Sequence, residues 1–64
     1  MTQPVNRPHS EFSDHDVCLM AEALLRRHGP AAADVASHFA QEHEEIRDFP
    51  RAAAWRRVET WLRG

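Results

Sequence analysis

Cysteine and glycine are scarce in this chain of 64 residues, which holds one cysteine and two glycines. Because Cys18 has no second thiol to pair with, an intramolecular disulfide is excluded, and a single cysteine within a predicted helix is typical of a reducing cytosol. Gly29 and Gly64 leave no glycine-rich loop that could hold a phosphate group. No apolar run approaches the roughly 18 residues of a membrane span, and residues 1–12 lack the apolar stretch of a secretory signal. We therefore predict a cytoplasmic protein.

Lysine is absent, so all eight basic residues are arginine, and alanine runs occur at 31–33 and 52–54. This composition suggests a GC-rich, bacterial genome. The length allows one domain, and a core of this size rarely supplies more than about 3–5 kcal/mol of net stability. Small domains often add a disulfide, a metal or a partner subunit. Since the disulfide is excluded, a partner subunit is a natural candidate.

The net charge of −2 conceals an uneven distribution. Residues 1–46 hold three arginines against eight acidic residues, whereas residues 47–64 hold five arginines against two acidic residues. Such polarity can steer a charged partner. It can equally be satisfied within the fold, if the basic third helix lies along acidic neighbours.

Capping signals mark the ends of the first predicted helix, at about 14–28. Ser13 is a strong N-cap candidate with Asp16 three residues later, and Gly29 can take the left-handed conformation that closes a helix. Residues 1–11 lack periodicity and contain two prolines, so we predict a flexible N-terminal arm. The apolar stripe of this helix is expected to face inward: Val17, Ala21, Leu24 and His28, widened by Cys18 and Leu25.

Two further helices are predicted, at about 31–46 and 50–63, with Asp48 as a plausible cap of the latter. Turns of only a few residues make successive helices spatial neighbours, and no segment shows the alternation of a strand. The predicted fold class is all-α, a compact three-helix domain over residues 12–64. Its remaining inward positions are Ala32, Val35, Ala36, Phe39, His43 and Ile46 in the second helix, and Ala54, Trp55, Val58 and Leu62 in the third.

Two motifs carry a family resemblance: LLRRHG at 24–29 and AAAWRRV at 52–58, on either side of an Ala/Val-rich helix. Together they resemble a family of short, uncharacterised proteobacterial helical proteins, a domain of unknown function. In that family the first helix ends in a His-Gly pair, and the third is built around an Ala-x-x-Trp-[Arg/Lys]-Arg-[Ile/Val] run. The similarity covers about residues 14–62, and IRDFPR departs from it by lacking a glycine. The resemblance implies the helical fold and supplies no activity.

Histidine spacing argues against a metal site. His38 and His43 are five residues apart, about 140° around a helix, so they cannot chelate one ion together. His43 is predicted to lie at the edge of the core. His15 and Cys18 supply only two ligands, too few for a tetrahedral zinc site. A third possibility, His38 with two neighbouring glutamates, is more simply a solvated acidic face.

The sequence also gives little support for a catalytic site. Ser37 has His38 beside it, but adjacent residues on a helix do not face each other. A bundle of this size is expected to have little room for a pocket of about 300 Å³ or more. We predict no catalytic, cofactor-binding or metal-binding residue, and hence no enzyme.

The third predicted helix carries the strongest binding signal, because arginine and tryptophan are enriched in interface hot spots. The competing interpretation is that Trp55 is core and Arg57 merely covers Trp61. Our first hypothesis is a non-enzymatic protein-interaction or regulatory module that binds a partner protein or itself as a homodimer. The alternative is nucleic-acid binding, which an isoelectric point of about 6.2 disfavours. No membrane partner is expected. The candidate partner-binding residues are Arg51, Arg56, Arg57, Trp61 and Arg63.

Overall fold

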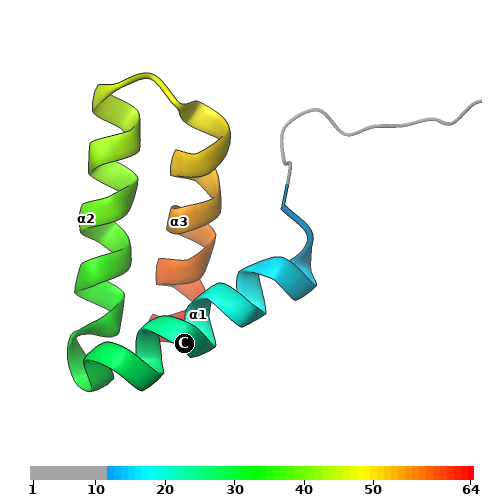
Figure 1. Cartoon of the computed structure of the whole chain (residues 1–64), viewed down its shortest axis with the longest axis vertical. Coiled ribbons are helices and arrows are strands. Elements are labelled where there is room, and N and C mark those ends of the chain that lie inside the picture. The colour runs from blue at the N-terminus through cyan, green and yellow to red at the C-terminus, as the bar shows by residue number, and fades with distance from the viewer. Residues whose placement is uncertain (1–11) are drawn as a thin grey trace, which may run out of the picture.

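The computed structural model describes residues 12–64, and all regular structure in that range is helical (Figure 1). The predicted all-α class is therefore confirmed, whereas the predicted flexible arm at 1–11 lies outside the described residues. The elements in chain order are α1 (Asp14–His28), the 3-10 turn η1 (Gly29–Ala31), α2 (Ala32–Glu45) and α3 (Phe49–Arg63).

The junction between α1 and α2 contains no loop. Gly29 has a positive φ of 55°, but its ψ of −129° lies outside the predicted left-handed region; its backbone N–H donates to the carbonyl of Leu25. Pro30 then lies within η1, and α2 begins directly at Ala32. As a result, the chain runs as one bent helical path from α1 to the end of α2, rather than as two fully separate helices, before it turns back into α3.

The turn between α2 and α3 closes without a glycine. Arg47 takes a left-handed conformation with φ of 63°, which is costly for a residue with a side chain. The N–H of Asp48 donates to the carbonyl of His43 at 2.8 Å. The carboxylate of Asp48 accepts the backbone N–H of Arg51, so the predicted N-cap of α3 is confirmed. This turn reverses the chain within three residues.

α2 and α3 lie side by side in opposite directions, and α1 crosses their lower end (Figure 1). The contacts between α2 and α3 are the most extensive, and α1 contacts each of them less. The N-terminal half of α1 extends outward from the α2–α3 pair (Figure 1). α1 is therefore the least supported of the helices.

Alanine dominates the core. The small side chains let the helices approach closely, but they bury little apolar area, and Val58 is the largest side chain that is fully buried. The rings of Phe39 and Trp55 meet edge to face with their centroids 4.9 Å apart. The buried residues are Val17, Ala21, Leu24, Ala32, Ala36, Ala40, Ala52, Ala54 and Val58. Partly buried side chains around the core are Phe12, Met20, Val35, Phe39, Trp55 and Leu62.

Three residues predicted to face inward are exposed instead. Leu25 is 48% exposed and Ile46 is 71% exposed, and His28 also lies in solvent. Because α1 crosses the other helices rather than running along them, only the centre of its apolar stripe is covered. Ile46 follows the last turn of α2, at the outer end of the α2–α3 pair, where no neighbouring helix covers it.

A candidate contact groove between the first and third helices

An open groove of about 550 Å³ lies between the start of α1 and the outer face of α3. Three of the five predicted partner-binding residues, Arg56, Arg57 and Trp61, line it, whereas Arg51 and Arg63 do not. The expectation that the domain has little room for a pocket was wrong, because α1 crosses α3 and leaves this angle open. The lining residues, which define the α1–α3 groove, are Asp14, Val17, Arg56, Arg57, Thr60 and Trp61.

The wall on the α1 side is positioned by the cap of that helix. The backbone N–H of Asp16 donates to Ser13 Oγ at 3.1 Å, and the N–H of Ser13 donates to Asp16 Oδ2 at 3.2 Å. This confirms the predicted capping box, which fixes the first turn of α1. Asp14 lies in that turn, and the buried side chain of Val17 lies one turn further on.

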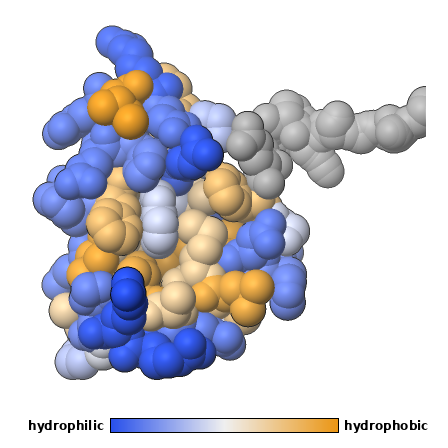
Figure 2. Space-filling view, in the orientation of Figure 1, coloured by the Kyte–Doolittle hydropathy of each residue, from blue (hydrophilic) through white to orange (hydrophobic). Residues whose placement is uncertain are grey.

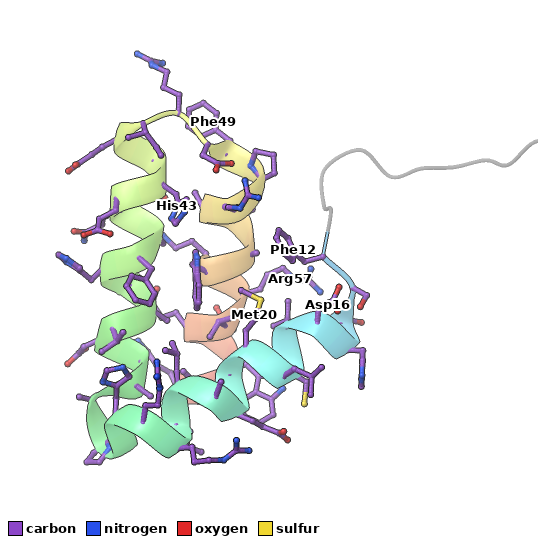
Figure 3. The ribbon with its side chains drawn as sticks, viewed as in Figure 1. Phe12, Asp16, Met20, His43, Phe49 and Arg57 are labelled. Carbon is purple, nitrogen blue, oxygen red and sulfur yellow. The ribbon has the colours of Figure 1, made fainter. Side chains whose placement is uncertain are left out.

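Arg57 ties α3 to the start of α1. Its guanidinium donates to the carbonyl oxygen of Phe12 at 2.8 Å and forms an ion pair with the carboxylate of Asp14. Figure 3 shows Arg57 directed from α3 toward Phe12 and the first turn of α1. The Asp14 side chain is nevertheless 98% exposed, so this ion pair forms the solvent-facing rim of the groove.

Arg56 belongs to a ladder of charges between α2 and α3. It pairs with Glu44 at 3.2 Å and with Glu59 at 3.1 Å, and Arg63 pairs with Glu59 at 2.9 Å and with Asp34 at 3.2 Å. The hydrogen bond from Arg63, followed by that from Arg56, holds the pKa of Glu59 below its usual value. The ladder connects the acidic second helix to the basic third helix.

The remaining predicted arginine, Arg51, lies beside the cap of its own helix. Its guanidinium donates to Asp48 at 3.0 Å, and this hydrogen bond lowers the pKa of the Asp48 carboxyl. All four arginines proposed for partner binding thus have a carboxylate partner within the chain. The uneven charge of the sequence is satisfied, in large part, by α3 lying against acidic residues of α1 and α2.

Trp61 is the exposed apolar member of the groove. Its side chain is 48% exposed, whereas Trp55 is partly buried against Phe39. The two tryptophans therefore have different environments: Trp55, predicted to face inward, packs against the core, whereas Trp61 lines the groove. Figure 2 shows apolar residues gathered at the centre of one face, where the helices meet, with hydrophilic residues around them.

The other chemically active side chains are dispersed. His43 is half-buried with Nδ1 2.9 Å from the carbonyl of Phe39, which agrees with the predicted place at the core edge. His38 pairs with Glu42 at 3.0 Å on an exposed face. Within residues 12–64, no group of three or more histidine, cysteine, aspartate or glutamate side chains is placed to hold a metal ion.

Cys18 lies on α1 with its thiol 3.7 Å from a carboxylate oxygen of Glu22. Partial burial, reinforced by the charge and the hydrogen bond of Glu22, raises the pKa of this thiol. A raised pKa makes the sulfur less nucleophilic at neutral pH. None of the helices in the described part of the chain is both long and apolar enough to cross a membrane.

Sequence reasoning found the α3 side of the groove and missed the α1 side. The sequence pattern places Val17 in the core and assigns no binding role to Asp14 or Thr60, which also line the groove. Asp14 and Arg57 are 43 residues apart, so no periodicity connects them. Their opposite charge, together with the uneven charge of the two chain segments, was the available signal.

Comparison with known proteins finds no match for this chain among family models, curated proteins or solved structures. The resemblance to short proteobacterial helical proteins stays a prediction.

Proposed function

We propose that this chain is a small, non-enzymatic three-helix module of the cytoplasm that binds another protein chain through the α1–α3 groove. The observation that carries the proposal is the half-exposed indole of Trp61 beside two arginines and a buried valine. Tryptophan and arginine are the residues most enriched in binding hot spots, where they fill pockets of the opposite surface. A module of this kind would act as a regulator by occupying a surface of its partner.

The placement of the polar residues supports a role without catalysis. The hydroxyl of Ser37 lies 3.3 Å from Arg56 Nη1, next to a cation rather than a base. Among residues 12–64, no polar or charged residue is buried. Active sites usually contain such groups, because burial shifts the pKa values on which acid–base catalysis depends.

Nucleic-acid binding receives less support than protein binding. A phosphate group approaching Arg56 or Arg63 would have to compete with carboxylates already paired to them. Nucleic-acid affinity arises largely from free cations that replace the counterions of the phosphates. A gel shift at low salt tests this alternative, and a shift that weakens on raising the salt would favour it over the protein-binding proposal.

Replacement of Trp61 by alanine tests the proposed function. Cells that produce the tagged chain would be treated with a short crosslinker, and the captured proteins would be compared among variants. The wild-type chain and Leu19→Ala, whose side chain is 51% exposed away from the groove, should retain the same partner. Trp61→Ala should lose it while keeping the same helical circular dichroism. Equal capture by Trp61→Ala would refute the proposal.

A further inference from the structure

We infer that the occupant of the α1–α3 groove is a second copy of this chain, in a two-fold dimer in which each copy inserts Trp61 into the groove of the other. This inference rests on the proposed function, because it names the partner of the same surface. Three features favour a second copy: the charges at the groove, the exposed Leu25 side chain further along α1, and the small core.

The charges at the groove of one copy are complementary to those at the groove of a second copy. Asp14 and Arg57 lie together at its rim, and the Asp14 side chain is 98% exposed even with Arg57 beside it. A two-fold axis brings the same patch of both copies together, so that residue i meets residue j twice. Asp14 of each copy would thus face Arg57 of the other, and each carboxylate would lie between two guanidinium groups. A surface of one sign would repel its own copy, whereas this rim carries both signs.

The apolar surface of α1 extends the groove along one helix face. Leu25 lies 11 residues after Asp14, a separation that returns to nearly the same side of a helix about 16 Å further along. It is 48% exposed, and with Glu22 and Arg26 it lines a shallow hollow of about 260 Å³. Glu22 and Arg26 carry opposite charges, as Asp14 and Arg57 do. The face from Asp14 to Leu25, together with Trp61, therefore offers an elongated patch in which two half-exposed apolar side chains, Leu25 and Trp61, lie among charged residues.

Because the core is small, covering this patch with a second copy would stabilise the folded chain. Six of the nine buried residues are alanine, while Trp61 and Leu25 each leave about half of their surface in water. A fully buried aromatic side chain covers about 150–250 Å², so the half-exposed Trp61 has about half of that area left to bring to an interface. Burial between two copies would add apolar area that the fold of one chain does not supply, and dimerisation stabilises the folded state by mass action.

Sedimentation equilibrium from micromolar to millimolar concentration tests the dimer. The wild-type chain should show a reversible monomer–dimer equilibrium, and Trp61→Ala should raise its Kd at least about tenfold, as expected for the loss of a hot spot. Ile46→Ala is the matched control, because Ile46 is more exposed than Trp61 and lies outside the groove. If both substitutions weaken the dimer equally, or if Ile46→Ala alone does, the groove is not the interface.

Exchange of charges between copies tests the two-fold arrangement. Asp14→Arg and Arg57→Asp should each weaken self-association, because like charges would then face each other across the interface. An equimolar mixture of the two variants should associate at least about tenfold more tightly than either alone, since every substituted position meets its opposite on the other copy. A mixture no tighter than its components would overturn the two-fold model. Circular dichroism verifies that each variant is folded.

Fluorescence provides a readout that needs no charge reversal. In a Trp55→Phe chain the emission comes from Trp61 alone, and it should move to shorter wavelength as the concentration rises.

Different results would refute the proposed function and the proposed dimer. A strict monomer whose crosslinked partner still depends on Trp61 would overturn the second copy and leave the proposed function standing. If neither self-association nor capture depends on Trp61, both proposals fail.

Discussion

Replacement of Arg47 by glycine should stabilise the fold, because this residue closes α2 in a left-handed conformation with φ of 63°. A residue with a Cβ pays about 1–2 kcal/mol for that conformation. Glycine removes the penalty but gives the unfolded chain more freedom, which costs about 0.4–1 kcal/mol. The expected net gain in the free energy of unfolding is about 0.8 kcal/mol, the middle of a range from about 0 to 1.6 kcal/mol. In a domain of this size a gain of about 0.8 kcal/mol raises Tm by about 3–6 °C.

Thermal and urea unfolding followed by circular dichroism measure this gain. Arg47→Ala is the matched control, because it removes the charge and keeps the left-handed strain, and it should not share the increase. If Arg47→Ala stabilises as much as Arg47→Gly, the gain comes from the charge and not from the backbone. A loss of stability on Arg47→Gly would refute the strain argument outright.

The end of α1 and the ionisable side chains can be tested in the same way. Gly29→Ala should lower the free energy of unfolding in urea by about 1–3 kcal/mol, because φ of 55° with ψ of −129° is a backbone conformation that glycine adopts far more readily than other residues. Because Asp48 and Glu59 have lowered pKa values in the fold, their contribution to stability is present above their unfolded pKa values and is lost as the pH falls below about 4. Urea unfolding from pH 6 to pH 3 should show that loss, and Glu59→Gln should lose less stability; an equal slope would contradict it. Glu22→Gln should speed alkylation of Cys18 at fixed pH, because the carboxylate raises the pKa of the thiol, and an unchanged rate would show that Glu22 does not act on the sulfur.

The sequence predicted the helices well because helix caps and helix periodicity depend on residues that are close together in the chain. Ser13 with Asp16, Gly29 and Asp48 each form hydrogen bonds or backbone conformations within a few residues, so the sequence around them contains the full cause. The apolar period likewise placed Val58 at the centre of the core. These features depend on helix geometry and not on the rest of the chain.

Features that depend on how the helices cross were not predictable in the same way. Leu25 and Ile46 have the correct period for burial, yet they are exposed because no neighbouring helix covers their positions. The four arginines of α3 were identified as a binding surface, but their carboxylate partners are set by packing. Arg57 and Asp14 are far apart in the sequence, so only the crossing of α1 over α3 brings them together.

We propose that the α1–α3 groove is the surface through which this chain meets another. Backbone amide NMR shifts, recorded as the protein is diluted from millimolar to micromolar concentration, test it residue by residue. We predict that the concentration-dependent shifts gather at residues 14–26 and 57–61 and leave the α2–α3 turn unchanged. Shifts centred on residues 46–49, or no concentration dependence at all, would contradict the proposal that a second copy binds in the groove.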